Sequence, residues 1–135
     1  MSLNDTERNT LVDLYLEKAW GTLSEAKLAA SEESWGMAAN RLYYTLFHAT
    51  TALFVNDCIE VSSHRGIKAK LGQHYILTGK MPVENSQFLA RMETLRDKAD
   101  YNIMFVAKEN DVIPNIILAE KYIKDIQQMV GRPLI

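Results

Sequence analysis

Residues 38–54 read AANRLYYTLFHATTALF and form the most apolar stretch of the 135-residue chain. Apolar residues fall on nearly every side of a helix drawn through this stretch, which is typical of a helix surrounded by others. We therefore expect a helix from Trp35 to about Asn56, at the centre of a bundle or across a dimer interface. The same stretch carries Arg41, Tyr44 and His48. Polar groups in so apolar a segment need partners, because burying them unpaired costs free energy.

Helical periodicity continues on both sides of this stretch, and proline and glycine are scarce, with 3 and 6 copies. Apolar residues recur at spacings of three and four, which places them on one face of a helix. The chain is therefore expected to be all-α, an antiparallel up-and-down bundle of about five helices in a single domain, residues 1–135. The expected helices span Thr6 to about Ala30, Trp35 to about Asn56, Ser62 or Ser63 to about Leu77, Pro82 to a point between Asn102 and Asn110, and Asp111 to about Val130.

Residues that favour the start of a helix support these boundaries. Asp5 or Thr6, Ser34 and Asp111 each precede an apolar periodic segment. Their side-chain oxygens can accept hydrogen bonds from the free backbone N–H groups of a first turn. Pro114 is expected in the first turn of the last helix, where a missing N–H costs little.

Composition and charge exclude several classes of protein. Hydrophobic residues make up 47% of the chain and charged residues 24%, as in an ordinary globular protein rather than a disordered one. The net charge of -2 gives no overall attraction to polyanions, so any nucleic-acid binding requires a local patch. The N-terminus is polar, and no stretch approaches the ~18 consecutive apolar residues of a membrane helix. We therefore expect a cytoplasmic protein that does not bind membranes.

One segment is a candidate for a basic patch. Between Val61 and Val83 the chain has no acidic residue but several basic ones. Arg65 and Lys68 lie in this segment and are candidates for phosphate contact. The alternative is an ordinary solvated helix face.

Metal and cofactor motifs are absent from the sequence. The three histidines are scattered, and Cys58, the only cysteine, has no neighbouring ligand at metal-binding spacing. The glycines do not form a phosphate-binding loop. We therefore expect neither a metal nor a cofactor.

Two short polar strips are the candidates for a functional site. Arg41, Tyr44 and His48 are three or four residues apart and share one face of the central helix. Arg96 and Asp100 are four apart on the next long helix. If these helices are neighbours, the strips can meet. Such a meeting is either a structural ion pair or a functional site, because charge networks occur in both.

The residues around these strips resemble a known family. The pattern ANRLYYTLFHA is followed by LGQHYILTGKMP and then by LRDKADYN, which contains Tyr101 and ends at Asn102. In order and spacing these segments resemble the prokaryotic HEPN domain family, in particular the branch with an Arg-x-x-Ala-Asp-Tyr motif. The resemblance covers about Ala19 to Tyr122. It implies a helical bundle that forms a homodimer and partners with a minimal nucleotidyltransferase in a two-gene toxin–antitoxin system.

The resemblance also implies a chemistry. Many HEPN relatives are metal-independent ribonucleases that use Arg, four to six residues and then His, with the arginine holding the scissile phosphate and the histidine moving protons. Here no histidine follows Arg96 within that window, and Asp100 and Tyr101 stand in its place. Arg41 and His48 are separated by six residues and so match the spacing of this motif. They lie on the central helix and not on the helix of Arg96, so we interpret the match as coincidence.

These observations predict a HEPN-type component of a toxin–antitoxin or defence module that binds RNA or a nucleotide. Arg96, Asp100 and Tyr101 are the catalytic candidates, with Asp100 as a base in place of histidine, or the site binds phosphate without cleavage. The phosphate-binding candidates are Arg41, Tyr44, His48, Arg65 and Lys68. The alternatives are a non-enzymatic module that binds a nucleotidyltransferase partner and a nucleotide-binding regulator.

Overall fold

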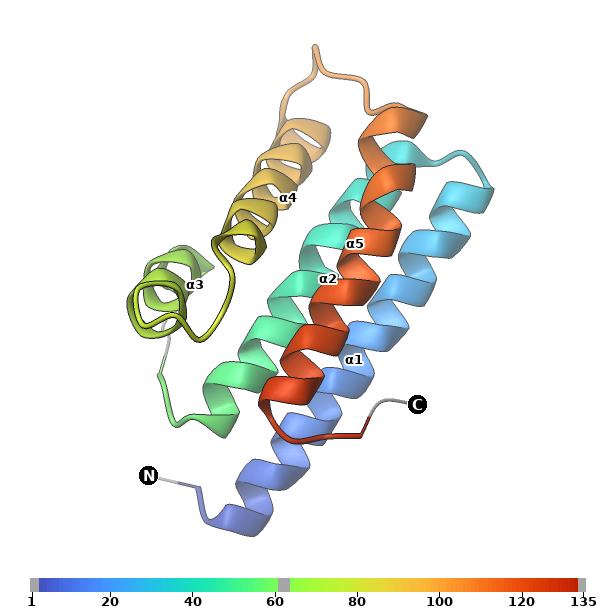
Figure 1. Ribbon diagram of the computed structural model, residues 1–135. Helices are drawn as coiled ribbons and strands as arrows, with labels where there is room; N and C mark the ends of the chain where they lie inside the picture. The colour runs from blue at the N-terminus through green and yellow to red at the C-terminus, as the bar shows by residue number, and fades with distance from the viewer. Residues whose placement is uncertain (1–2, 61–63, 134–135) are drawn as a thin grey trace.

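The computed structural model describes residues 3–60 and 64–133 of the chain. Four long helices lie side by side and run alternately up and down, and a short one lies beside α4 (Figure 1). The all-α bundle predicted from the sequence is therefore confirmed. The predicted start of the third helix at Ser62 or Ser63 lies outside the described residues. In chain order the elements are α1 (Asp5–Ser31), α2 (Trp35–Asn56), α3 (His64–Leu71), the single π-helical turn η1 (Gly72–Ile76), α4 (Val83–Tyr101) and α5 (Glu109–Met129).

Helix α2 is the centre of the bundle, as its apolar sequence predicted. It packs against α1, α4 and α5, and its bounds match the predicted ones. Leu42 and Leu46 are fully buried, and Thr50 places its hydroxyl 2.6 Å from that of Tyr122 on α5. Burial raises the pKa of the Tyr122 phenol, which therefore stays protonated and able to donate. The core is thus apolar, and the Thr50 and Tyr122 hydroxyls within it are paired.

Helix α1 begins one residue earlier than predicted. Its cap is Asn4 and not Asp5 or Thr6. The Asn4 side chain accepts a hydrogen bond from the Glu7 N–H at 2.8 Å, and the Glu7 carboxylate accepts one from the Asn4 N–H at 2.9 Å. These two reciprocal hydrogen bonds satisfy two backbone N–H groups that would otherwise be free at the start of the helix. A cap at Asp5 or Thr6 would not form them.

The other predicted caps differ in detail from the structure. Ser34 is the cap residue of α2, but its side chain makes no capping hydrogen bond. Helix α5 begins at Glu109, before Asp111, whose carboxylate accepts a hydrogen bond from the N–H of Lys108 at 2.9 Å. Pro114 therefore lies in the second turn and not in the first. Asp111 stabilises the start of α5 from inside the helix.

The segment from α3 to η1 is fixed to the end of α2. Tyr75 is buried, and its hydroxyl donates to the Asp57 carboxylate at 2.5 Å. Burial, and then this hydrogen bond, raise the pKa of Tyr75. Its ring stacks on Phe54, with 5.8 Å between ring centroids. These contacts fix η1 to the end of α2, and α3, which runs directly into η1, packs against α4.

No helix in the described part of the chain is long and apolar enough to span a membrane.

Candidate functional site

Arg96 is the centre of the candidate site. It lies on α4, and only 13% of its side chain is exposed. Its guanidinium carbon lies over the rings of Tyr43 and Tyr44 on α2, at 4.8 and 5.6 Å from their centroids, and 5.8 Å from that of Tyr101. The ring faces attract the cation in a site with little water. The tyrosines of two helices therefore hold one arginine between them.

The hydrogen-bonding capacity of Arg96 is only partly used. One terminal nitrogen lies 3.0 Å from the carboxylate of the adjacent Asp97. The buried Nε has no hydrogen-bond partner among the described residues. A guanidinium has five N–H donors in a planar fork that matches the oxygens of a phosphate. Arg96 therefore keeps donors available for an anionic ligand.

His64, at the start of α3, joins this group. Its ring stacks on Phe47, with 4.1 Å between centroids, and its Nδ1 lies 3.3 Å from the hydroxyl of Tyr43. Burial, followed by the charge of Glu93, raises the pKa of Tyr43, so its hydroxyl stays protonated. Tyr43 thus contacts both Arg96 and His64. We call Tyr43, Tyr44, His64, Arg96 and Tyr101 the Arg96 cluster.

Sequence reasoning gave His64 no role. The residue was one of several basic groups in the segment from residue 61 to 83, and it precedes Arg96 in the chain rather than following it. Only the packing of α3 against α4, with the His64 ring on Phe47 of α2, brings an imidazole to the rings that surround the arginine. The only feature of the sequence that could have pointed to His64 is its position next to the predicted start of the third helix.

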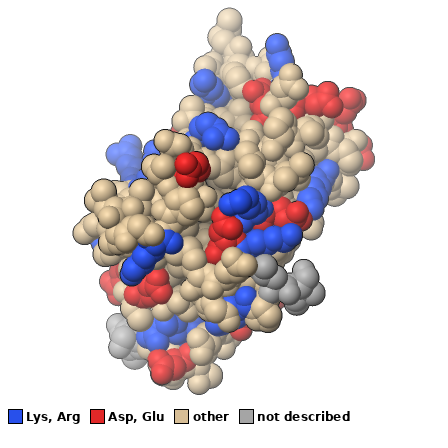
Figure 2. All heavy atoms as spheres, in the orientation of Figure 1, with Lys and Arg blue, Asp and Glu red and all other residues tan. Residues whose placement is uncertain are grey.

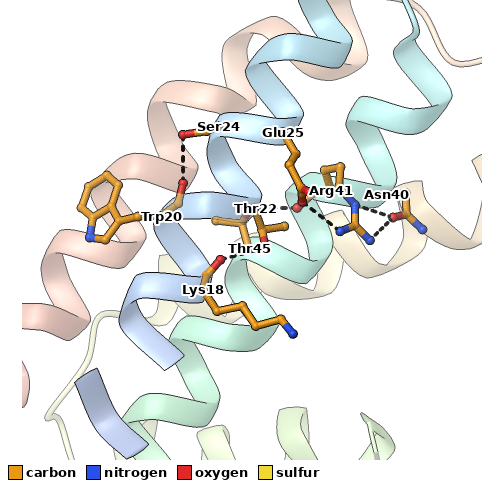
Figure 3. Close-up of polar contacts among 8 residues, drawn as sticks. All are labelled: Lys18, Trp20, Thr22, Ser24, Glu25, Asn40, Arg41 and Thr45. Atoms are coloured by element: carbon orange, nitrogen blue, oxygen red, sulfur yellow. Dashed lines mark hydrogen bonds and ion pairs between the residues drawn. The ribbon is translucent and has the colours of Figure 1, made fainter. Parts of the chain in front are cut away.

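The two polar strips meet, but through partners other than those expected. The Asp100 carboxylate accepts a hydrogen bond from the Asn40 amide at 2.9 Å. The Asn40 carbonyl oxygen accepts two from Arg41, at 3.0 and 2.8 Å. Figure 3 shows Arg41 between Asn40 and Glu25 of α1, whose carboxylate lies 3.2 Å from its guanidinium. A polar chain thus runs from α1 through α2 to α4.

Arg41 is therefore already paired at two positions. It also lies over Tyr44, at 5.4 Å from the ring centroid, so it borders the Arg96 cluster without entering it. Tyr44 contacts both arginines. Tyr101 is 76% exposed at the end of α4, so its ring forms the open rim of the cluster.

His48 adds no positive charge to the site at neutral pH. Burial, followed by the nearby charges of Lys18 and Arg41, lowers its pKa to about 4. Its Nδ1 is buried and has no hydrogen-bond partner among the described residues. Its ring packs at 6.2 Å from that of Tyr44. His48 is therefore a neutral residue that packs against Tyr44 of the Arg96 cluster.

The two basic candidates on α3 differ in their surroundings. Lys68 lies 2.7 Å from the carboxylate of Glu93 on α4, so its charge is neutralised locally. Arg65 is exposed on α3, close in sequence to His64. The basic segment therefore contributes less free charge than its composition indicated. In the described part of the chain no three His, Cys, Asp or Glu side chains converge as a metal site would require.

Comparison with known proteins identifies the fold family. The sequence model of the HEPN domain matches residues 12–130, which include every residue of the Arg96 cluster. The chain belongs to the HEPN domain family. The resemblance noted in the sequence is thereby confirmed, and the all-α bundle of this HEPN protein agrees with it.

Three relatives resemble this HEPN protein in sequence, and the name of one of them states a role. A UPF0332 protein of Thermotoga maritima is 29% identical over 124 residues, covering 92% of this chain and 94% of its own. A UPF0332 protein of Gloeobacter violaceus is 29% identical, covering 64% of this chain and 68% of its own. A Methanocaldococcus jannaschii protein named "Putative toxin" is 25% identical, covering 71% of this chain and 65% of its own.

Proposed function

We propose that this HEPN protein is the toxin-type component of a toxin–antitoxin or defence module. It binds RNA through the Arg96 cluster and cleaves it without a metal ion. The observation that carries the proposal is Arg96, which lies over three tyrosine rings and whose buried Nε has no hydrogen-bond partner among the described residues. The relative named a toxin supports the biological role.

Each group near the cluster has a role in this proposal. Arg96 binds the phosphate and offsets the negative charge that grows on its oxygens in the transition state. The exposed ring of Tyr101 offers a face on which a base stacks. The nucleophile is the 2′-hydroxyl of the RNA, and either Asp100 or His64 accepts its proton. Its oxygen bonds to the adjacent phosphorus and the bond from phosphorus to the 5′-oxygen breaks, which leaves a 2′,3′-cyclic phosphate and a 5′-oxygen that takes a proton from water. Asp100 and His64 can each accept the proton without a cofactor.

The first experiment measures RNA cleavage in excess EDTA with wild type, Arg96→Ala and Arg91→Ala. Arg91 is the matched control, because it lies on the same helix, over the ring of Phe88 at 5.2 Å, but outside the Arg96 cluster. We expect Arg96→Ala to lower the cleavage rate by ~100-fold or more and Arg91→Ala to leave it unchanged. Equal and negligible cleavage by all three proteins, both in EDTA and in Mg²⁺, would rule out the proposed nuclease activity.

The second experiment identifies the proton acceptor. His64→Gln and Asp100→Asn are compared with wild type across the pH–rate profile. The variant that removes the base lowers the rate and abolishes the acidic limb of the profile, whereas the other leaves that limb in place. If both variants retain the wild-type profile, neither residue is the base.

A non-enzymatic role is the second candidate, and a specific contact favours it. The Asp100 carboxylate accepts a hydrogen bond from Asn40, and this bond links α4 to α2. Asp100 therefore has a structural role that does not require it to take part in catalysis. In this case the protein binds a nucleotidyltransferase partner, and no histidine is needed after Arg96. Arg96→Ala then weakens binding to the purified partner or lowers the melting temperature. RNA cleavage is absent throughout, and calorimetry with ATP tests the nucleotide-binding version.

A further inference from the structure

The hydroxyl of Tyr43 and the imidazole of His64 form a pair within the Arg96 cluster. Tyr43 is 1% exposed, and its hydroxyl lies 3.3 Å from Nδ1 of His64. A buried hydroxyl that donates to nothing costs free energy, because its hydrogen bond to water is not replaced. Among the described residues, only Nδ1 of His64 is placed to accept the proton of this hydroxyl.

The direction of this hydrogen bond fixes which nitrogen of the imidazole carries hydrogen. Burial, followed by the charge of Glu93, raises the pKa of Tyr43, so the hydroxyl keeps its proton and can donate it. A neutral imidazole has one N–H and one acceptor nitrogen. Because Nδ1 accepts from Tyr43, Nε2 carries the hydrogen. His64 is exposed, and its Nε2 has no partner in the part of the chain that the structure describes. His64 therefore retains an N–H donor for a ligand.

Aromatic contacts hold this imidazole in place beside Arg96. The His64 ring stacks on Phe47, with 4.1 Å between centroids, and lies 6.2 and 5.9 Å from the ring centroids of Tyr43 and Tyr44. The guanidinium carbon of Arg96 lies over the same two tyrosines, at 4.8 and 5.6 Å from their centroids. The imidazole and the guanidinium thus share both tyrosine rings as neighbours, although they come from α3 and α4. A ligand bound at these rings can contact both groups.

The carboxylates near these two groups are already paired. Glu93 lies 2.7 Å from the ammonium of Lys68, and Asp97 lies 3.0 Å from one terminal nitrogen of Arg96. The other terminal nitrogen of Arg96 has no hydrogen-bond partner among the described residues. On the face drawn in Figure 2, basic and acidic side chains are interspersed, so no extended basic surface there attracts an anion. A phosphate is therefore held by specific donors rather than by overall charge.

We propose that His64 binds a phosphate oxygen through its Nε2–H beside Arg96, and that Tyr43 is the positioning residue that fixes this tautomer. This role rests on the phosphate binding proposed above for the Arg96 cluster. The guanidinium and the imidazole N–H together donate to two oxygens of one phosphate. Because the neutral ring uses Nδ1 as acceptor for Tyr43 and Nε2 as donor, it has no nitrogen left to take a proton. In RNA cleavage the carboxylate of Asp100 therefore accepts the proton of the 2′-hydroxyl.

The first test determines the tautomer of His64 by ¹⁵N NMR of the imidazole at pH 7.5. We expect hydrogen on Nε2, and a Tyr43 hydroxyl proton that couples to Nδ1. Tyr43→Phe removes only the hydroxyl, so the coupling disappears and the Nδ1 resonance moves. Tyr122→Phe is the matched control, because the buried hydroxyl that it removes pairs with Thr50, and its His64 resonances match wild type. Hydrogen on Nδ1 in wild type overturns the proposal, as does an Nδ1 resonance that Tyr43→Phe leaves unchanged.

The second test measures the binding of inorganic phosphate at constant ionic strength. His64→Gln places an amide N–H near the position of Nε2, whereas the shorter side chain of His64→Asn does not reach it. We expect His64→Gln to bind phosphate within about twofold of wild type and His64→Asn to bind it at least about tenfold more weakly. Lys80→Ala is the control, because it removes an exposed charge from the same basic segment. Equal weakening by His64→Asn and Lys80→Ala overturns the proposal, because it shows an effect of overall charge alone.

RNA cleavage in EDTA separates a failure of this proposal from a failure of the proposed nuclease. We expect His64→Asn to lower kcat/KM by about tenfold, and His64→Gln to keep most of the activity together with the acidic limb of the pH–rate profile. Cleavage whose acidic limb His64→Gln abolishes makes His64 the base, which overturns this proposal and leaves the nuclease standing. If no RNA is cleaved while the tautomer and the phosphate affinities are as expected, the nuclease is wrong and the phosphate site is supported.

Discussion

The neutral state of His48 predicts a specific loss of stability in mild acid. The pKa of His48 is about 4 in the folded protein, against 6.5 for an ordinary histidine, chiefly because the ring is buried. As the pH falls below 6.5, the unfolded chain takes up a proton on this residue and the folded one does not. The contribution to stability is therefore complete above pH 6.5 and is lost between pH 6.5 and about 4.

The size of the effect follows from the two pKa values. At pH 5 they correspond to a loss of about 2 kcal/mol in the free energy of unfolding. The ring is partly exposed, so solvent screening reduces the expected loss to about 1 kcal/mol. For a domain of this size that loss lowers the urea midpoint by roughly 0.5 M. Lys18 on the neighbouring α1 and Arg41 on the same helix as His48 contribute to the shift.

The assay is urea denaturation of wild type and His48→Gln at pH 7.5 and pH 5. We expect the midpoint of wild type to fall more than that of His48→Gln, because glutamine does not titrate. His74→Gln is the control and keeps the wild-type fall, since it leaves His48 in place. Identical falls for wild type and His48→Gln would refute the reasoning, as would an NMR titration that shows His48 gaining its proton above pH 6.

Three further predictions concern the stability of the bundle, all measured by urea denaturation at pH 7.5. Leu46→Ala, at a fully buried position on α2, is expected to cost about 3–5 kcal/mol, whereas Ile117→Ala on the surface of α5 changes stability by less than about 0.5 kcal/mol. Tyr122→Phe leaves the buried hydroxyl of Thr50 without its partner on α5 and is expected to cost about 1–2 kcal/mol. Gly131 has a φ of +73°, so Gly131→Ala is expected to cost about 1 kcal/mol from backbone strain, since an added Cβ would contact nothing within 4 Å.

The candidate site was predicted in part. Spacing on a helix shows which residues share a face, so Arg96 and Asp100 were correctly placed on one helix that faces the polar strip of α2. Spacing does not show which neighbouring helix a side chain reaches. Arg41 turns to Glu25 on α1, and Asn40 takes the place expected for it beside Asp100.

The sequence did not predict what the tyrosines of α2 contact. Tyr43 was an ordinary packing position in a helical pattern, and Tyr44 was a member of the polar strip and a candidate for phosphate contact. In the structure their ring faces hold Arg96. An attraction between a cation and a ring requires the two groups to be stacked at a particular angle and distance. Helical spacing contains no such information for residues so far apart in the chain.

Sequence alone determined that the stretch from residue 38 to 54 forms the central helix, because so many apolar side chains can be buried only by neighbours on most sides. It also determined the family, through the order and spacing of Arg, Tyr and Asp. Tertiary structure alone decided what the polar residues of that helix contact. The packing of α3 brings His64 to Tyr43, and the crossing of α2 and α4 places Arg96 on two tyrosine rings. These contacts depend on the rotation of each helix about its axis, which the packing of the whole core fixes.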